Sequence, residues 1–231
     1  MPNILITGSN RGIGLELTRQ YAQAGWRVFA TCRHPAEADQ LRQLSNQHPL
    51  ITIHRVDVTV MEDIKAITLE LKDTALDILF NNAGIFLEED YRLPALGGIR
   101  YDHWLRTFDV NTLGAVRMTE ALLGNVAMSN KRLIAVMTSH MGSIEDIDME
   151  GSYYYRSSKA ALNAAMQGLS AAVRPHQVGI LLLHPGAVNT RMSPGGISPE
   201  KSVNGLRRII DEFSFSDSGS FIKHDGTPMP W

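Results

Sequence analysis

The feature that most constrains the fold is an alternation between short apolar runs, rich in β-branched residues, and longer segments with helical spacing. The apolar runs, which we expect to be strands, are Asn3–Thr7, Arg27–Thr31, Ile51–Val56, Ala75–Phe80, Leu133–Thr138 and Gly179–Leu183. The segments expected to be helical are Gly12–Ala24, Ala36–Gln47, Val60–Lys72, Trp104–Met128 and Tyr155–Val173. Such alternation indicates βαβ units, and runs that are apolar throughout indicate a sheet covered on both faces. The sequence predicts an α/β fold, one domain over residues 1–231 with a Rossmann-type, doubly wound parallel sheet of about seven strands.

Three connections are longer than the usual link between a strand and a helix. They are Ile85–His103, Gly142–Tyr154 and Pro185–Pro199. In an open α/β sheet, ligands bind beyond the carboxyl ends of the strands, where such loops emerge. We therefore expect the functional site there.

Composition excludes several classes of protein. The 231 residues carry a net charge of −2, so no bulk positive charge favours nucleic acid or an anionic membrane. One cysteine rules out an intramolecular disulfide, and no apolar stretch reaches the roughly 20 residues of a membrane span. The eight histidines show no metal-ligand spacing. We expect a soluble cytoplasmic protein without a metal site.

A glycine-rich turn follows the first expected strand and precedes a helical segment. It contains Gly8, Gly12 and Gly14 in the spacing G-x-x-x-G-x-G. Glycines let the backbone approach a phosphate, and the amides at the following helix start suit a pyrophosphate. The candidate cofactor-binding residues of this turn are Gly8, Asn10, Arg11, Gly12, Ile13 and Gly14. The alternative interpretation is a tight strand–helix turn without a ligand.

The end of the second expected strand bears on the choice of cofactor. An acidic residue about 20 positions after the glycine turn would bind the ribose hydroxyls of NAD, but Cys32 and Arg33 stand there. Guanidinium groups at Arg33 and Arg11 suit a 2′-phosphate, which favours NADP(H) over NAD(H), unless both are solvated loop charges. Asp57 and Val58, after the third run, are further candidates; Asp57 either accepts from the adenine amino group or caps a helix.

Tyr155 and Lys159 are candidates for acid–base chemistry. Their spacing of four residues puts both side chains on one helix face. A nearby ammonium favours the phenolate and is expected to lower the pKa of the tyrosine toward working pH. Taken alone, this spacing is also that of an ordinary surface pair.

Other polar residues follow the expected strands at the same edge of the sheet. Ser139 follows the fifth run, where its hydroxyl would reach a substrate carbonyl, and Asn111 lies within a helical segment, where asparagine is unfavourable unless it has a distant partner. Small residues after the fourth run would let a flat cofactor lie close, and Thr190 would contact a carboxamide. The cofactor-binding candidates after the fourth run are Asn82, Ala83 and Gly84. Those after the sixth run are Pro185, Gly186, Val188 and Thr190.

Together these motifs resemble the short-chain dehydrogenase/reductase family over nearly the whole chain. The matching pieces, in order, are Thr7–Gly14, Asp57-Val58, Asn81–Gly84, Asn111, Ser139, Tyr155–Lys159 and Pro185–Thr190. The segments Tyr155–Asn163 and Asp225–Trp231 resemble more narrowly the C-factor-like and sniffer-type carbonyl reductase branch.

The resemblance implies an NAD(P)-dependent oxidoreductase acting on a small-molecule carbonyl or alcohol. It implies that Tyr155 protonates the carbonyl oxygen, that Ser139 orients the carbonyl, and that Lys159 binds the nicotinamide ribose. Asn111 would support a water that links Lys159 to solvent. Relatives also pair helices across a two-fold axis, so a homodimer or homotetramer is expected.

Two departures and one alternative accompany this resemblance. The gap from Ser139 to Tyr155 is 16 residues, slightly longer than is usual in the family, and the acidic run Glu88-Glu89-Asp90 has no assigned role. The alternative is a cofactor-binding signalling protein of C-factor type in which turnover is secondary. The four candidates Asn111, Ser139, Tyr155 and Lys159 argue against it, because a pure binding protein has no chemical need for the tyrosine.

Overall fold

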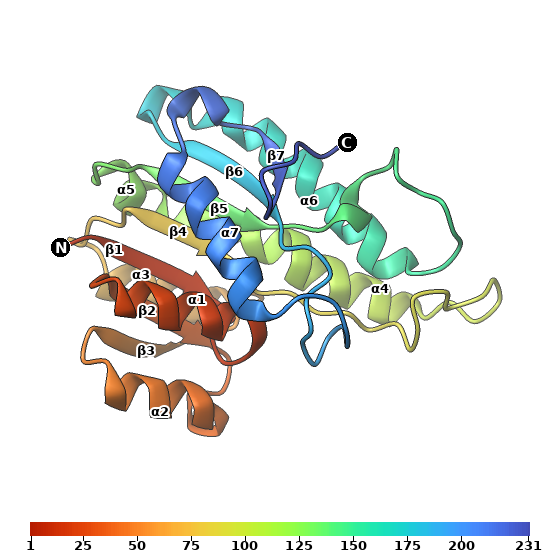
Figure 1. Ribbon diagram of the computed structural model, residues 1–231, viewed down its shortest axis with the longest axis horizontal. Helices are drawn as coiled ribbons and strands as arrows, with labels where there is room; N and C mark the ends of the chain where they lie inside the picture. Colours follow the sequence, from red (N-terminus) through yellow and green to blue (C-terminus); the bar gives the residue numbers. More distant parts are fainter.

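The computed structural model describes residues 1–231 and contains a seven-stranded sheet in which all neighbouring strands run parallel (Figure 1). The strands are β1 (Asn3–Thr7), β2 (Arg27–Cys32), β3 (Ile51–Arg55), β4 (Ile78–Asn81), β5 (Leu133–Met137), β6 (Gly179–His184) and β7 (Phe221–Lys223). Their order in space is β3-β2-β1-β4-β5-β6-β7. The direction of winding reverses between β1 and β4, and such a reversal leaves a crevice at the carboxyl ends of the strands.

Helices cover both faces of this sheet. They are α1 (Gly12–Gln23), α2 (Asp39–Gln47), α3 (Met61–Glu70), α4 (Tyr101–Phe108), α5 (Gly114–Ala127), α6 (Tyr153–Ala172) and α7 (Pro199–Glu212). One core of 23 buried residues lies under α1, α2 and α7 and includes Leu17 and Leu206. A second core of 23 lies under α3, α5 and α6 and includes Met118 and Leu162. The predicted doubly wound fold is confirmed.

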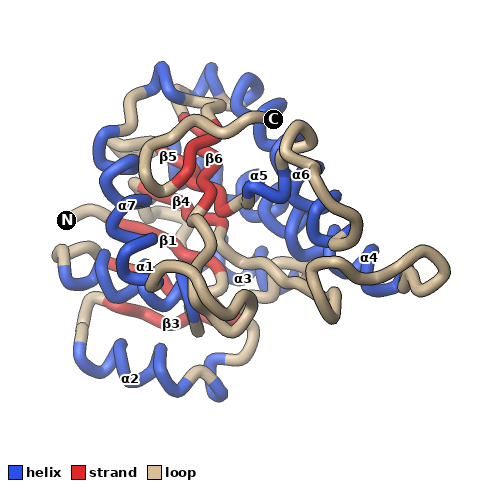
Figure 2. The backbone as a smooth tube through the Cα atoms, turned by 45° about the vertical axis from the view of Figure 1, so that its right-hand side comes forward, coloured by secondary structure: helices blue, strands red, loops and turns tan.

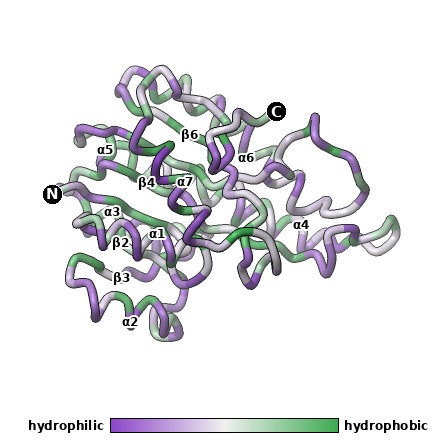
Figure 3. The backbone as a smooth tube through the Cα atoms, viewed as in Figure 1, coloured by the Kyte–Doolittle hydropathy of each residue, from purple (hydrophilic) through white to green (hydrophobic).

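The central strands explain why the apolar runs do not alternate with polar residues. Every residue of β4, β5 and β6 is buried, because each strand packs helices on both sides. A fully buried leucine or isoleucine contributes about 1.5–3 kcal/mol to folding, so these strands supply much of the driving force. In Figure 3 the hydrophobic colour follows the sheet strands, whereas the helix tubes alternate between hydrophilic and hydrophobic.

Several element boundaries differ from the predicted ones. The sequence predicts about seven strands but locates only six of them; the edge strand β7 was not located, since three residues, Phe221–Lys223, are too few to show a pattern. The fourth strand begins at Ile78 because the preceding residues turn toward α5, where the Leu76 amide donates to the Asn125 carbonyl. Helix α6 begins at Tyr153, two residues before the predicted start.

The predicted helix Trp104–Met128 is interrupted by a π turn, Asp109–Leu113, between α4 and α5. The turn changes which side chains face α6. The Asn111 amide donates to the Ser158 hydroxyl at 3.0 Å, and the Thr112 hydroxyl donates to the Ser158 carbonyl at 2.8 Å. Consecutive residues thus contact one helix, which regular α-helical spacing of about 100° per residue disfavours.

The long loops gather on the side of the sheet toward which the strands point (Figures 1 and 2). Two of them, the loop before α4 and the loop before α6, extend beyond the helical layers in both views. No helix has both the length and the apolar character required to cross a membrane.

Candidate functional site

A cleft of about 1430 Å³ is formed by the segments that follow β1, β2, β3, β4, β5 and β6. It lies where the sequence predicted a ligand site. The predicted site residues that line it are Gly8, Asn10, Arg11, Gly12, Ile13, Gly14, Arg33, Asp57, Val58, Asn82, Ala83, Gly84, Ser139, Tyr155, Lys159, Pro185, Gly186, Val188 and Thr190. Asn111 is the one predicted residue that does not line it; its side chain is buried behind the wall.

The glycine turn packs directly against the residues after β4. Gly8 has a φ of +70°, and a Cβ there would lie 3.0 Å from the Cα of Ala83. A Cβ at Gly14 would overlap the carbonyl oxygen of Gly8. The side-chain amide of Asn82 donates to the carbonyls of Thr7 and Gly8, at 2.9 and 3.2 Å, so Asn82 braces the turn as well as lining the cleft. Any side chain larger than the hydrogen of glycine is therefore excluded at Gly8 and at Gly14.

The start of α1 provides free backbone donors at the cleft. The helix has no side-chain cap at Arg11 and no acidic residue in its first turn. Its first amides and the positive end of its dipole are thus available to an anion. A Cβ at Gly12 would lie 3.4 Å from Cγ2 of Thr190, which brings the loop after β6 against the glycine turn.

Two arginines at this end of the cleft have no carboxylate partner. The side chains of Arg11 and Arg33 are exposed, line the cleft, and make no hydrogen bond or ion pair with the protein. The charge of Arg33 contributes to the lowered pKa of Asp57. Both cations are free to meet an anionic group of a ligand.

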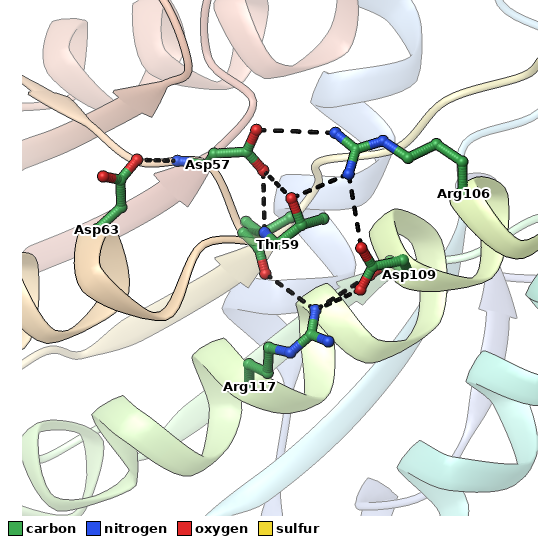
Figure 4. Close-up of polar contacts among 7 residues, drawn as sticks. Asp57, Thr59, Asp63, Arg106, Asp109 and Arg117 are labelled. Carbon is green, nitrogen blue, oxygen red and sulfur yellow. Dashed lines mark hydrogen bonds and ion pairs between the residues drawn. The ribbon is translucent and has the colours of Figure 1, made fainter.

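Asp57 forms a local turn and does not cap a helix. Its Oδ1 accepts from the amide and the hydroxyl of Thr59, at 2.9 and 2.7 Å, while α3 begins after Val60 without a side-chain cap (Figure 4). The helix-cap alternative is therefore wrong. Burial alone would raise the pKa of Asp57, but the Thr59 bonds and the charge of Arg106 outweigh it and lower the pKa.

The same polar network fixes the π turn. The guanidinium of Arg106 lies 3.8 Å from the carboxylate of Asp57 and 3.5 Å from that of Asp109. The guanidinium of Arg117 lies 2.7 Å from the carboxylate of Asp109 (Figure 4). Arg106 also donates to the hydroxyl of Thr59 at 3.1 Å. The loop after β3 is thereby tied to both ends of the segment that carries Asn111.

Lys159 is almost completely buried below the cleft floor. Its side chain is 3% exposed, and Nζ donates to the Met137 carbonyl at 2.8 Å and lies 5.7 Å from the centre of the Tyr155 ring. Burial lowers the pKa of Lys159 to about 8. The ammonium therefore exchanges its proton much closer to neutral pH than an exposed lysine does.

The protonation of Tyr155 differs from the expected direction. Burial raises the pKa of Tyr155 to about 12; Tyr91 and Glu88 add to this rise, and the Ser139 side chain opposes it. The predicted lowering by Lys159 is not observed, because burial is the largest influence on the pKa of Tyr155 and Lys159 is not among the groups that shift it. At neutral pH Tyr155 is therefore a protonated phenol, and this protonated form can donate a proton.

Ser139 and Asn111 have defined partners. The Ser139 hydroxyl accepts from the Met141 amide at 3.2 Å and opens a short 3-10 helix, His140–Gly142. Asn111 both accepts from the Ile85 amide, at 2.8 Å, and donates to the Ile85 carbonyl, at 2.9 Å. These two bonds tie Asn111 to a loop residue 26 positions earlier in the chain.

Other residues of the cleft were not singled out by the sequence. Phe86 packs against both Tyr91 and Tyr155, with ring centres 5.0 and 5.3 Å apart. His140 and His184 have ring centres 5.1 Å apart, and burial lowers the pKa of His184 to about 3. These residues come from loops and strand ends without a spacing that marks them, so only the folded chain reveals the cluster.

Comparison with known proteins gives a consistent picture. The model of the family described as short chain dehydrogenase matches residues 2–199. The chain is similar to the C-signal of Myxococcus xanthus, with 40% identity over 158 residues, covering 68% of this chain and 93% of that protein. It is also similar to 1-hydroxy-2-glutathionyl-2-methyl-3-butene dehydrogenase of Rhodococcus sp. (strain AD45), with 33% identity over 239 residues and 100% of both chains.

Solved structures share the fold over the whole chain. The NADPH-bound carbonyl reductase from chicken fatty liver has a TM-score of 0.91 and 30% identity, covering 100% of this chain and 99% of that one. The carbonyl reductase Sniffer of D. melanogaster has a TM-score of 0.91 and 32% identity, covering 100% of both chains. A carbonyl reductase of Pseudomonas aeruginosa PAO1 in complex with NADP has a TM-score of 0.85 and 28% identity, again with full coverage.

Proposed function

Because this chain belongs to the short-chain dehydrogenase family and is an oxidoreductase, we propose that it uses NADPH to reduce the carbonyl of an aldehyde, ketone or quinone, with Tyr155 as general acid. The observation that carries the proposal is the meeting of three side chains in the cleft: Ser139 is hydrogen-bonded to Tyr155, and Lys159 Nζ lies 5.7 Å from the centre of the Tyr155 ring. The protonated phenol of Tyr155 suits the reductive direction, in which the developing alkoxide needs a proton.

The residues at the other end of the cleft fit a dinucleotide with a 2′-phosphate. The glycine turn leaves no room for side chains, the start of α1 presents amides without a competing carboxylate, and Arg11 and Arg33 are unpaired. Thr190, whose side chain packs against Gly12, would bind the carboxamide of the nicotinamide. A bound NADPH would supply the hydride to the carbonyl carbon; the protein supplies orientation and the proton.

Proton transfer is the task of the protein's own groups. The Ser139 hydroxyl orients the carbonyl, and the Tyr155 hydroxyl gives its proton to the carbonyl oxygen, yielding the alcohol. Lys159, with a pKa of about 8, then returns a proton toward Tyr155 at neutral pH. A Cβ at Gly84 would lie 3.4 Å from Asn111 Oδ1 and 3.8 Å from Lys159 Nζ, so the missing side chain leaves a path for a water between them.

Carbonyl-dependent oxidation of NADPH, measured over a panel of aldehydes, ketones and quinones, tests the proposal. The Tyr155→Phe variant keeps the ring but removes the proton, so turnover is expected to fall by about 10²–10⁴ while NADPH affinity stays within about twofold. NADH serves as the cofactor control. Equal turnover by wild type and variant would exclude Tyr155 as the acid.

A second function is favoured by the 40% identity to C-signal over 68% of this chain. In that case the chain acts as a cofactor-binding signalling protein, and turnover is secondary. The same variant separates the two: a signalling role survives Tyr155→Phe as long as NADPH still binds, whereas a reductase role does not.

A further inference from the structure

Glu88 is a buried carboxylate with no role in the chemistry described so far. It lies in the loop between β4 and α4 and is 8% exposed, whereas its neighbours Glu89 and Asp90 are exposed. Its Oε1 accepts from the backbone amide of Tyr155 at 2.7 Å, and its Oε2 has no partner. Burying a carboxylate is costly unless its interactions repay the lost hydration. The Glu88 carboxylate is therefore buried at a cost, and its one hydrogen bond is to the backbone amide of Tyr155.

Glu88 supplies what the start of α6 lacks. Ser152, the N-cap residue, is left-handed with a φ of +50°, and its hydroxyl donates to the Tyr91 carbonyl at 2.7 Å instead of capping the helix. The first turn of α6 holds no acidic residue. The first amides of a helix need acceptors and favour a negative charge, and Glu88 meets both needs from a segment 67 residues earlier in the chain.

The rest of the same loop is also fixed to the start of α6. The Ser152 amide donates to the Leu93 carbonyl at 2.9 Å, and the Arg100 amide donates to the Tyr154 hydroxyl at 2.6 Å. The Phe86 ring packs against the Tyr155 ring at 5.3 Å. Since the loop contacts α6 at several points, the Glu88 bond is part of a docked segment and is not an isolated contact.

We propose that Glu88 is a positioning residue for Tyr155: it fixes the backbone turn that carries the phenol and sets a negative charge close to it, so that Tyr155 keeps its proton until a carbonyl takes it. This rests on the proposed function of Tyr155 as general acid. It also gives the acidic run a role, with Glu88 as its functional member.

The charges around Tyr155 give the sign of the effect. From the loop, Glu88 and Tyr91 both favour the protonated phenol; from the segment after β5, the Ser139 side chain favours the phenolate. From α6 itself, Lys159 lies 5.7 Å from the ring centre. Burial is the largest influence and raises the pKa of Tyr155, and removing the charge of Glu88 lowers it.

Two variants separate the two parts of this role. Glu88→Gln removes the charge but keeps an oxygen that accepts from Tyr155, and Glu88→Ala removes both. Glu89→Gln, at the exposed neighbour, is the matched control. Glu88 does not line the cleft, so NADPH affinity is expected to stay within about twofold in all three.

The charge is tested by the pH profile of alcohol oxidation with NADP⁺, in which the rate rises as Tyr155 loses its proton. The rising limb is expected to move toward lower pH by a fraction of a pH unit in Glu88→Gln and to stay in place in Glu89→Gln. NMR titration of ring-labelled tyrosine, assigned with Tyr155→Phe, measures the same shift without turnover. If neither the rising limb of the pH profile nor the titration of the Tyr155 resonance moves in Glu88→Gln, the proposed electrostatic effect of Glu88 is overturned.

The backbone contact is tested by hydrogen exchange at the Tyr155 amide. Exchange is expected to accelerate about tenfold in Glu88→Ala and to change little in Glu88→Gln. Unchanged exchange in Glu88→Ala overturns the positioning part, and if that variant fails to fold, Glu88→Gln still tests the charge. Absence of turnover in wild type would refute the proposed function alone, because the exchange and NMR experiments do not depend on it.

Discussion

The two ends of the cleft are built from different kinds of structure. At the glycine-turn end, formed by the residues that follow β1 and β2, short turns are held by backbone contacts such as those of Gly8 with Ala83. At the loop end, formed by the three long loops after β4, β5 and β6, exposed apolar side chains such as Ile144 and Ile147, 70% and 50% exposed, stand along the loops. The first end tolerates little change, whereas the second has room to vary without disturbing the fold. Such a division between a constrained end and a variable end suits a protein family whose members share a cofactor but differ in substrate.

The largest effect is expected at the glycine-turn end. In Gly14→Ala the new Cβ overlaps the Gly8 carbonyl, so the turn must shift; stability is expected to fall by about 2–3 kcal/mol, and NADPH affinity at least tenfold. Denaturant unfolding and fluorescence titration of NADPH measure the two. Gly124→Ala is the matched helical control, since nothing lies within 4 Å of its Cβ; it is expected to be neutral or slightly stabilising. Equal behaviour of both variants would contradict the contrast between the two ends.

A smaller and more selective effect is expected at Arg33. Replacing it with serine removes a charge that has no partner in the protein, so stability is expected to remain within about 0.5 kcal/mol. Affinity for NADPH is expected to fall about tenfold and that for NADH to stay unchanged, because only NADPH carries the 2′-phosphate. Parallel titrations with the two cofactors measure this ratio. An equal loss for both would show that Arg33 does not read the phosphate.

At the loop end, His184 is expected to make stability depend on pH. Its pKa is lowered from 6.5 to about 3 by burial, so between these values the folded state binds fewer protons than the unfolded state. Its contribution is intact above pH 6.5 and is lost as the pH falls toward 3. Melting temperature is expected to fall less steeply over this window in His184→Asn than in wild type. The exposed His176→Asn is the control, and equal slopes in the two variants would refute the assignment.

The smallest effect on the fold is expected from Ile147→Ser. The side chain is half exposed on the cleft rim, so stability and NADPH affinity are expected to be unchanged within about 0.5 kcal/mol. The KM values of apolar carbonyl substrates are expected to rise by two- to threefold, as an apolar contact is lost. A clear loss of NADPH affinity would mean that the two ends of the cleft are coupled.

The glycine-turn end was predictable because its signals are local. Gly8 to Gly14 lie in one turn, so spacing along the chain already implies proximity; outside that end, the same holds for Tyr155 and Lys159, which share one helix face. Glu88 was visible only as part of an acidic run, since its partner Tyr155 is 67 residues away and its burial depends on how the loop docks. The protonation state of Tyr155 was missed for a related reason: burial, the largest influence on its pKa, depends on how segments far apart in the chain pack around α6.

The strand order has a consequence for how the chain is made. β1 pairs with β2 on one side and with β4 on the other, and residues 33 to 77 separate these two partners. During synthesis, one edge of this strand therefore stays open until β4 has left the ribosome, although its own residues emerge early. An apolar strand with an open edge is a template for unwanted pairing between chains. Yield on expression is thus expected to depend on how fast the first eighty or so residues assemble, a burden that the finished sheet no longer shows.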